Sequence, residues 1–391
     1  MPIKINQSKA RRNSEEMNTY RIPFGNLEIG PVAREYINQA LDRNWISEGS
    51  NVRLFEERFA EKFGWRHAIM TSSGTMAGQV VWMAIRELTR EKWGDAEVVT
   101  PACAFVATAS CILAAGLKLR FADVDMTLNL DPTKLEDAQS VYGAMGCQFV
   151  MNMGRSVNLR CAEQLPSWKF YVVDACEGHG GTYSGMQTAK YCGADAAIFS
   201  LYTAHLIISG EGGVICTDRD DIADLCRSIK SHGRPVGSNY FDFQRIGTNA
   251  KANELTAAIG LEGLERFDEA FEKRRIIRKK LLERLSEFPL ILFPDAEGEV
   301  IAPHAFPILL ADENGDIGPL YNHLEKNGIE CKTLWGALSN HKAFRWMGIP
   351  EGTFPVAERI GRTGLHFSCG DFITDDDIDY IGRTIGGYFH G

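Results

Sequence analysis

Apolar residues recur along the chain with two alternating periods, which predict a repeated succession of strands and helices. Phe55, Phe59 and Phe63 lie four residues apart, as on one face of a helix, and an apolar helix is expected from about Ala77 to Leu88. Short apolar runs between the helical segments predict strands at His67–Thr71, Glu97–Val99, Leu119–Val124, Cys147–Asn152, Phe170–Val173, Ala196–Ser200 and Gly213–Thr217. Strands that alternate with helices form mainly parallel sheets, so the first two-thirds of the chain is predicted to be an α/β sheet with helices on both faces.

A second, smaller unit is predicted after this α/β region. A long helix is expected from about Asn253 to Phe288, where Pro289 stops it, and its basic run KRRIIRKK is interpreted as a solvated face. Beyond it lie a strand near Ala305–Leu310 and helices around Leu320–Lys326 and Asp376–Phe389. We therefore expect a flexible, polar N-terminal arm over residues 1–25, a large domain over 26–265 and a smaller α+β domain over 266–391.

Charge and composition exclude several classes of function. Among 391 residues, 42 Lys plus Arg stand against 51 Asp plus Glu, and this charge of −9 argues against binding to nucleic acid. The first residues lack the apolar core of a secretory signal, so we expect a cytoplasmic protein. The longest uncharged run, Ala102–Leu117, is too short to span a bilayer and is predicted to be a buried helix, with Thr100 as its cap and Pro101 at its first position.

The cysteines indicate neither disulfides nor a metal. Ten are scattered singly between Cys103 and Cys369, in a chain too large to need covalent staples. None forms a C-x-x-C pair or a cluster with metal-ligand spacing. We expect reduced thiols, no structural metal and no iron–sulfur cluster.

Candidate chemistry gathers where predicted strands end. The turn Ser72–Thr75 lies between a strand and a helix, where free backbone N–H groups bind phosphate, although Ser and Gly in such turns also serve merely as caps. Asp174 ends the strand Phe170–Val173 and lies at the edge of the sheet where open α/β sheets place ligands. A fixed carboxylate there is either a cap or a partner that keeps a heteroaromatic nitrogen protonated.

Taken in order, several segments make the chain similar to the DegT/StrS sugar aminotransferase family of fold-type I pyridoxal-phosphate enzymes. They are SSGT at Ser72–Thr75, TPACAFVATAS at Thr100–Ser110, FADVDMTLNLDP at Phe121–Pro132, VDACEG at Val173–Gly178, the stretch Phe199–Thr217 and NAKANELTAAIGLEGL at Asn249–Leu264. The resemblance implies an aspartate aminotransferase-like three-layer sandwich with a mainly parallel sheet. It also implies a homodimer with active sites at the subunit boundary.

The resemblance also implies roles for individual residues. It assigns Ser73, Gly74, Thr75 and Ser200 to the cofactor phosphate, Phe105 to stacking on the ring, Asp174 to the pyridine nitrogen, Glu177 to the vicinity of the ring hydroxyl and Asn249 to the phosphate in the neighbouring subunit.

One departure from the family pattern bears on the chemistry. Where family aminotransferases carry the lysine that binds the cofactor as an imine, this chain has His205, within Ser200-Leu-Tyr-Thr-Ala-His205. Imidazole forms no stable imine, so the cofactor is expected to bind non-covalently as pyridoxamine 5′-phosphate or pyridoxal 5′-phosphate. Histidine does transfer protons near neutral pH. The same exchange marks a subgroup that resembles GDP-4-keto-6-deoxy-mannose 3-dehydratase.

The expected activity is therefore removal of the C3 hydroxyl from a nucleotide-linked 4-keto-6-deoxyhexose. His205 would act as base and then as acid, and the products would be a 4-keto-3,6-dideoxy sugar and ammonia, with glutamate as amino donor by family resemblance. Two alternatives stay open: an aminotransferase whose lysine was exchanged deliberately or whose role has passed to another residue such as Lys190 or Lys251, and a ligand-sensing or scaffold protein without chemistry. His179 and His232 are either substrate contacts or ordinary loop histidines.

Overall fold

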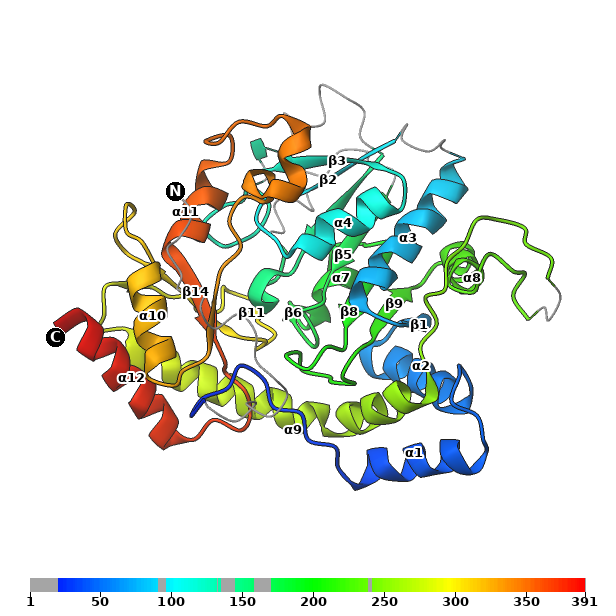
Figure 1. Ribbon diagram of the computed structural model, residues 1–391, viewed down its shortest axis with the longest axis horizontal. Coiled ribbons are helices and arrows are strands. Elements are labelled where there is room, and N and C mark those ends of the chain that lie inside the picture. The colour runs from blue at the N-terminus through cyan, green and yellow to red at the C-terminus, as the bar shows by residue number, and fades with distance from the viewer. Residues whose placement is uncertain are drawn as a thin grey trace.

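A computed structural model describes residues 20–90, 96–131, 133–134, 145–157, 170–237 and 241–390. Its N-terminal two-thirds surround one large sheet, its C-terminal third surrounds a smaller sheet, and a long helix runs along both (Figure 1). This arrangement confirms the predicted α/β fold. The expected boundary at residue 265 falls inside the long helix and stays a prediction.

The large sheet is mainly parallel. Its order is β1 (His67–Thr71), β9 (Gly213–Thr217), β8 (Ala196–Ser200), β5 (Phe170–Asp174), β4 (Gly146–Val150), β2 (Glu97–Pro101) and β3 (Lys118–Ala122). Neighbouring strands from β8 to β3 run parallel, whereas β9 is antiparallel to both β1 and β8. The parallel strands share one carboxyl edge, and the loops after β5 and β8 leave the sheet there side by side.

Two apolar layers cover this sheet. On one face pack α3 (Gly74–Thr89), α4 (Val106–Ala114) and α8 (Asp220–Ile229), and on the other pack α2 (Ser50–Phe63) and the first half of α9 (Glu254–Leu285). Phe55, Phe59 and Phe63 are the buried stripe of α2, as their spacing predicts. The side chain of Asn253 caps α9 by accepting hydrogen bonds from the backbone N–H groups of Leu255 and Thr256, both at 3.0 Å.

The smaller sheet is antiparallel, in the order β10 (Leu290–Ile291), β12 (Phe306–Leu310), β14 (Gly364–Phe367) and β13 (Cys331–Thr333). The second half of α9, α10 (Gly318–Lys326) and α12 (Asp375–His390) share its apolar core. The remaining elements of the described ranges are α1 (Pro31–Asp42), α7 (Thr188–Tyr191), α11 (Pro355–Thr363), the short strands β6 (Thr182–Tyr183), β7 (Met186–Gln187) and β11 (Glu299–Val300), and the 3-10 helices Asn152–Gly154, Leu338–Asn340 and Lys342–Met347.

The helix predicted over residues 102–117 is shorter than expected. Pro101 is the last residue of β2, and the backbone N–H of Ala102 continues the sheet by donating to the carbonyl of Ala122 at 2.8 Å. This pairing keeps the chain extended until Phe105, which is the N-cap of α4. The predicted cap at Thr100 is therefore wrong, because sheet pairing overrides the local signal.

Residues 20–25 are packed, although the sequence assigns them to a flexible arm. Ile22 pairs with Ile329 beside the smaller sheet, and its backbone N–H donates to the carbonyl of Gly328 at 3.0 Å. Phe24 is buried as well. These residues are thus part of the folded structure, while the rest of the predicted arm, residues 1–19, lies outside the described residues.

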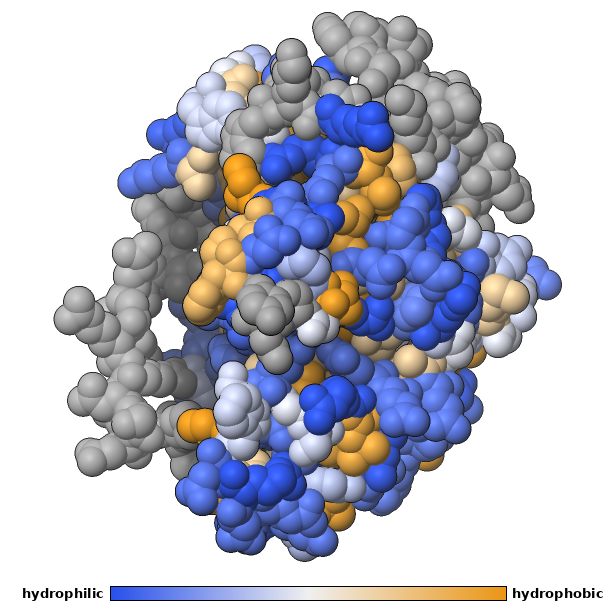
Figure 2. Space-filling model, turned by 90° about the vertical axis from the view of Figure 1, so that its right-hand side faces the viewer, coloured by the Kyte–Doolittle hydropathy of each residue, from blue (hydrophilic) through white to orange (hydrophobic). Residues whose placement is uncertain are grey.

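Within the described ranges, no helix combines the length and the apolar character needed to cross a bilayer. On the face that Figure 2 shows, apolar residues form separate patches in a mostly hydrophilic surface.

Candidate active site

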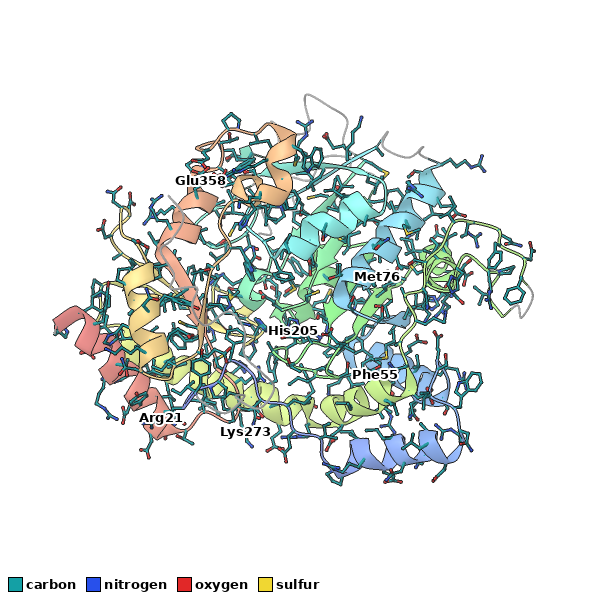
Figure 3. All side chains as sticks on the ribbon, in the orientation of Figure 1. Arg21, Phe55, Met76, His205, Lys273 and Glu358 are labelled. Atoms are coloured by element: carbon teal, nitrogen blue, oxygen red, sulfur yellow. The ribbon has the colours of Figure 1, made fainter. Side chains whose placement is uncertain are left out.

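A cavity of about 490 Å³ lies between the carboxyl edge of the large sheet and the smaller sheet. His205 lies near the middle of the molecule, between these two parts (Figure 3). The residues that the sequence predicts to form the site come together here: Ser73, Gly74, Thr75, Phe105, Asp174, Glu177, Ser200 and His205 all line the cavity. Asn249 does not line it; its Oδ1 accepts a hydrogen bond from Lys251 Nζ at 2.8 Å. Its predicted role toward a neighbouring subunit stays a prediction.

The start of α3 forms a tight cradle at one end of the cavity. Ser73 caps the helix, and its Oγ accepts from the backbone N–H of Met76 at 3.2 Å. The first N–H groups of a helix have no partner within it and point outward, so Gly74 and Thr75 offer them to the cavity. A Cβ on Gly74 would lie 2.9 Å from Ser200 Cβ and 3.1 Å from Cys176 Sγ. Only glycine at position 74 lets the start of α3 come this close to the segments after β8 and β5, around a small anion.

Asp174 is held rigidly at the end of β5. Its Oδ2 accepts from Thr108 Oγ1 at 2.7 Å, and its Oδ1 accepts from the backbone N–H of Cys176 at 3.2 Å. Burial raises the pKa of this carboxyl, because little water reaches the charge. A protonated ring nitrogen in the cavity would relieve that cost. The cradle and Asp174 thus fit the phosphate and the ring nitrogen of a pyridoxal-type cofactor.

The loop after β8 places His205 in the cavity. The loop is closed by hydrogen bonds from the N–H of Leu201 to the carbonyl of Gly212 at 2.9 Å and from the N–H of Ser209 to the carbonyl of Leu201 at 2.8 Å. Gly210 and Gly212 have φ values of 85° and 152°, which favour glycine and explain the glycine-rich sequence there. Burial, with the charges of Arg274 and Lys332 nearby, holds the pKa of His205 well below its usual value.

The opposite wall of the cavity was missed by sequence reasoning. It comes from the smaller sheet and the segments beside it, and consists of Phe24, His304, Lys332, Thr333, Trp335 and His366. Lys332, Thr333 and Trp335 come from one short segment, and the others stand singly in strands or loops, so no pattern of chemistry-bearing residues marks this wall. Of the described residues that line the cavity, Lys332 is the only lysine or arginine.

Histidines from both walls meet in the cavity. His205 Nδ1 lies 3.3 Å from His304 Nδ1, and His304 Nε2 lies 3.3 Å from Glu177 Oε1. The other carboxyl oxygen of Glu177 accepts from the backbone N–H of Met153 at 2.7 Å. Burial lowers the pKa of His304 to about 3 and raises that of Glu177 to about 8.

The two histidines left open by the sequence differ in their placement. His179 is fully buried behind the cavity, with its ring centroid 6.1 Å from that of His205, and neither ring nitrogen has a hydrogen-bond partner within the described part of the chain. It packs against Phe59 and Phe199. His232 is exposed, has a φ of 64° and does not line the cavity. A substrate contact from His232 within its own chain is therefore not supported.

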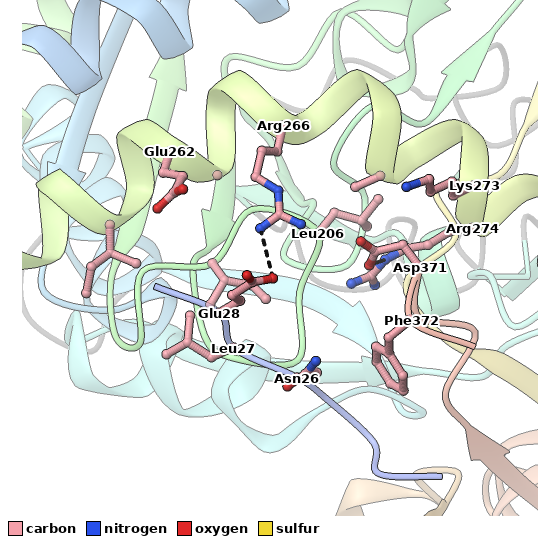
Figure 4. Close-up of a pocket in the computed structure, with 14 residues that line it drawn as sticks. Asn26, Leu27, Glu28, Leu206, Glu262, Arg266, Lys273, Arg274, Asp371 and Phe372 are labelled. Atoms are coloured by element: carbon pink, nitrogen blue, oxygen red, sulfur yellow. Dashed lines mark hydrogen bonds and ion pairs between the residues drawn. The ribbon is translucent and has the colours of Figure 1, made fainter. Parts of the chain in front are cut away.

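A second, smaller hollow of about 230 Å³ lies behind the loop that carries His205 (Figure 4). Its charges pair with one another: Arg266 lies 3.6 Å from Glu28, and Arg274 lies 3.2 Å from Asp371. Leu206 lines this hollow and His205 lines the cavity, so the loop that carries both residues separates the two. The charge of Arg274 lowers the pKa of His205 and His304 across this loop.

The comparison with known families decides the identity. A model of the DegT/DnrJ/EryC1/StrS aminotransferase family matches residues 28–386. The chain belongs to this family. It is 32% identical to GDP-perosamine synthase of Caulobacter vibrioides, over 89% of this chain and 93% of that protein. It is 28% identical to dTDP-4-dehydro-2,6-dideoxy-D-glucose 3-dehydratase of Saccharopolyspora spinosa, over 87% of this chain and 80% of that protein.

Among solved structures of the family, the fold is similar to a histidine-to-asparagine variant of GDP-4-keto-6-deoxymannose-3-dehydratase with bound GDP-perosamine. The TM-score is 0.84 at 25% identity, and the match covers 93% of this chain and 100% of that chain. The relatives of the chain therefore include both 3-dehydratases and other sugar-modifying enzymes of the family. The resemblance in the sequence motifs is confirmed at the level of the family.

Proposed function

We propose that the protein binds pyridoxamine 5′-phosphate without a covalent link and removes the C3 hydroxyl of a nucleotide-linked 4-keto-6-deoxyhexose. The products are a 4-keto-3,6-dideoxy sugar and ammonia. The observation that carries this proposal is His205, which lines the cavity from the loop where the family pattern has its lysine. The 3-dehydratases among the relatives support it.

In this proposal, the wall from the large sheet binds the cofactor and the opposite wall binds the substrate. Ser73, Gly74, Thr75 and Ser200 hold the phosphate, Phe105 covers the ring, and Asp174 keeps its nitrogen protonated. When bound, the cofactor supplies the amine that condenses with the C4 ketone and a ring that stores the electron pair released by deprotonation. Glu177 lies near the ring hydroxyl. The opposite wall, which carries Lys332 and Trp335, holds the sugar nucleotide.

His205 performs the proton transfers. Its Nδ1 faces His304, so its Nε2 is the ring nitrogen available to the cavity. Nε2 takes up one proton from the carbon that bears the cofactor amine and returns a proton to the C3 hydroxyl, which leaves as water. Burial favours the neutral ring that this first step requires, because it lowers the pKa of His205.

A nucleotide-sugar aminotransferase is the second candidate, favoured by the family's own description. The lysines first considered for an imine lie elsewhere: Lys190 Nζ pairs with Asp218 at 2.8 Å and Lys251 Nζ with Asn249 at 2.8 Å, and neither lines the cavity. Lys332 does line it, with its Nζ 4.3 Å from the ring centroid of Phe24. Among the described residues that line the cavity, it is the lysine available to an aminotransferase.

Glutamate as amino donor and a homodimer complete the proposal. The segment before Asn249 exposes large apolar side chains, among them Phe241 at 79% and Ile246 at 75%. Such side chains are covered in stable assemblies, and a second copy docked there would bring Asn249 toward its cofactor phosphate.

A silent ligand sensor would need no proton-transfer group beside Asp174.

The test is an assay of cofactor-loaded protein with GDP-, CDP-, UDP- and dTDP-linked 4-keto-6-deoxy sugars and glutamate. We expect ammonia release and loss of the C3 oxygen from one of them. Borohydride reduction of the pyridoxal phosphate form should leave the cofactor unattached, in wild type and in a Lys332→Met control. Covalent labelling that disappears in Lys332→Met, together with a 4-amino sugar product, would replace the dehydratase by the aminotransferase. A sensor would show neither product nor exchange of amine with glutamate.

A further inference from the structure

Three titratable side chains from three distant segments form a continuous chain through the cavity. His205 follows β8, His304 precedes β12 and Glu177 follows β5. The separations are 3.3 Å between the Nδ1 atoms of the two histidines and 3.3 Å between His304 Nε2 and Glu177 Oε1. The side chains of His304 and Glu177 are 4% and 13% exposed, so water does not compete strongly for these contacts.

This geometry couples the protonation of the three groups. Two Nδ1 atoms in contact need one proton between them, so a proton on one ring fixes the tautomer of the other. Glu177 then faces His304 Nε2 as acceptor when ionised and as donor when protonated. Because its second oxygen is held by the N–H of Met153, the carboxyl cannot turn away from His304.

We propose that His304 and Glu177 form a proton relay behind His205, which passes one proton from His205 Nδ1 toward Glu177 when His205 Nε2 accepts a proton, and passes one back when His205 has protonated the departing C3 hydroxyl. This inference rests on the proposed function. His304 and Glu177 act through His205 and are positioning residues in this role.

The proton count balances in both directions. Before the first transfer, Glu177 is ionised, His304 carries its proton on Nε2, and His205 carries one on Nδ1 with Nε2 free. After Nε2 accepts a proton, the Nδ1 proton passes to His304 Nδ1, and the Nε2 proton of His304 passes to Glu177. His205 is then neutral with its proton on Nε2, ready to act as an acid. Donation to the leaving hydroxyl and the reverse shift restore the first state.

Burial of the three side chains favours storage of a proton at Glu177. His205 and His304 face each other, and the charges of Arg274 and Lys332 act on both. His366 belongs to the same cluster. Burial is the main cause that lowers the pKa of all three histidines. Burial has the opposite effect on Glu177 and raises its pKa to about 8, although the hydrogen bond from Met153 and the charge of Lys332 both act to lower it. A lasting imidazolium is thus disfavoured, while a neutral Glu177 is favoured, and one buried imidazole can serve as base and acid in turn.

The test uses the tautomer of His205 in the cofactor-free protein, read from the ring nitrogen chemical shifts of ¹⁵N-histidine-labelled protein. As the pH rises through about 8, Glu177 should ionise and the His205 proton should move from Nε2 to Nδ1. His179 has no hydrogen-bonded partner in the described chain that could titrate, so its tautomer ratio should not change with pH. A His205 tautomer that does not change between pH 6 and 10 overturns the relay, and this measurement needs no variant.

The Glu177→Gln variant sharpens the test. The N–H of Met153 requires an oxygen opposite it, so the new amide turns its NH₂ toward His304 and holds His205 with its proton on Nε2 at every pH. The matched control is Glu262→Gln, at another buried glutamate that accepts a backbone N–H, from Gly30 at 2.8 Å. The control should retain the tautomer change, and a change that persists in Glu177→Gln contradicts the relay.

Activity separates the two proposals. In wild type the dehydration rate should rise with pH toward a plateau, and Glu177→Gln should lower it by about 10²-fold or more and remove that rise. Dehydration with an unchanged rate and pH profile in Glu177→Gln would refute the relay and leave the proposed function intact. A tautomer change without dehydration of any nucleotide sugar would refute the function and leave the coupled titration of these residues intact.

Discussion

The two walls of the cavity are built in different ways. The wall from the large sheet consists of strand ends and the turns that follow them, so Ser73, Asp174 and His205 are each held by backbone contacts within a few residues. The wall from the smaller sheet consists of isolated side chains such as His304, Lys332 and His366. Their positions depend on contacts between segments far apart in the sequence.

The difference separates cofactor binding from substrate selectivity and proton transfer. A phosphate cradle and a carboxylate for a ring nitrogen use local turns, which any chain of this fold can form in the same place. Substrate selectivity and proton transfer depend on the side chains of the second wall. Substitutions on the first wall should therefore affect all activity, whereas those on the second should change selectivity, affinity or pH dependence.

The largest effect is expected for His205→Asn. Loss of a positioned proton-transfer group costs about 10²–10⁴ in rate, and the half-buried side chain contributes little to the core, so the protein should still fold. Dehydration assays and thermal unfolding of the variant would measure both. Dehydration at the wild-type rate would show that the chemistry does not reside on the large-sheet wall.

Asp174→Asn should lower the rate by about 10- to 100-fold, because a hydrogen bond to a charged group contributes about 1.5–3 kcal/mol. The asparagine oxygen can still accept from the backbone N–H of Cys176 while the new NH₂ donates to Thr108 Oγ1, so the loop should keep its structure. The absorbance spectrum of bound cofactor would report the loss of ring-nitrogen protonation. An unchanged spectrum with wild-type turnover would contradict the assignment of Asp174 to the cofactor.

On the opposite wall, Lys332→Met should raise the KM for the nucleotide sugar about two- to fivefold, since an exposed charge contributes roughly 0.2–1 kcal/mol. Cofactor affinity should stay the same, because the cradle lies on the other wall. Steady-state kinetics and a cofactor titration would distinguish the two. A weakened cofactor with an unchanged KM would reverse the assignment of the walls.

The last prediction concerns stability, at the contact between the walls. Burial raises the pKa of Glu177 from 4.5 to about 8, so the unfolded chain releases this proton at lower pH than the folded protein does. The free energy of unfolding of the cofactor-free protein should therefore decrease as the pH rises from about 4.5 to about 8, relative to Glu177→Gln. Urea unfolding of both proteins at several pH values would measure the difference, and parallel curves would contradict it.

Much of the fold was readable from the sequence. The strands β1, β8 and β9 have the predicted bounds, and the succession of strands and helices gave the parallel sheet. The failures have one physical origin, which is pairing with distant segments. The N–H of Ala102 bonds to Ala122 and delays a helix, and Ile22 pairs with Ile329 and anchors residues predicted to be flexible.

The site divides in the same way. Ser73 and Asp174 stand where predicted strands end, the resemblance to the family assigned His205 to the same site, and the cavity brings the three together. His304 and His366 stand in apolar surroundings that resemble any buried strand. Only the folding of the smaller sheet against the large one brings them to the cavity, and no pattern within a few residues encodes that contact.

Phe24 closes the cavity by packing its ring edgewise against His366, at 5.2 Å between ring centroids, and near His304, at 6.2 Å. These residues leave the ribosome at opposite ends of translation. A nascent chain with a complete large sheet would thus display a phosphate cradle open to solvent, lacking its far side until the last segments emerge. Exclusion of water from the bound vitamin B6 derivative should accordingly be a late event in biogenesis, after synthesis of residue 366.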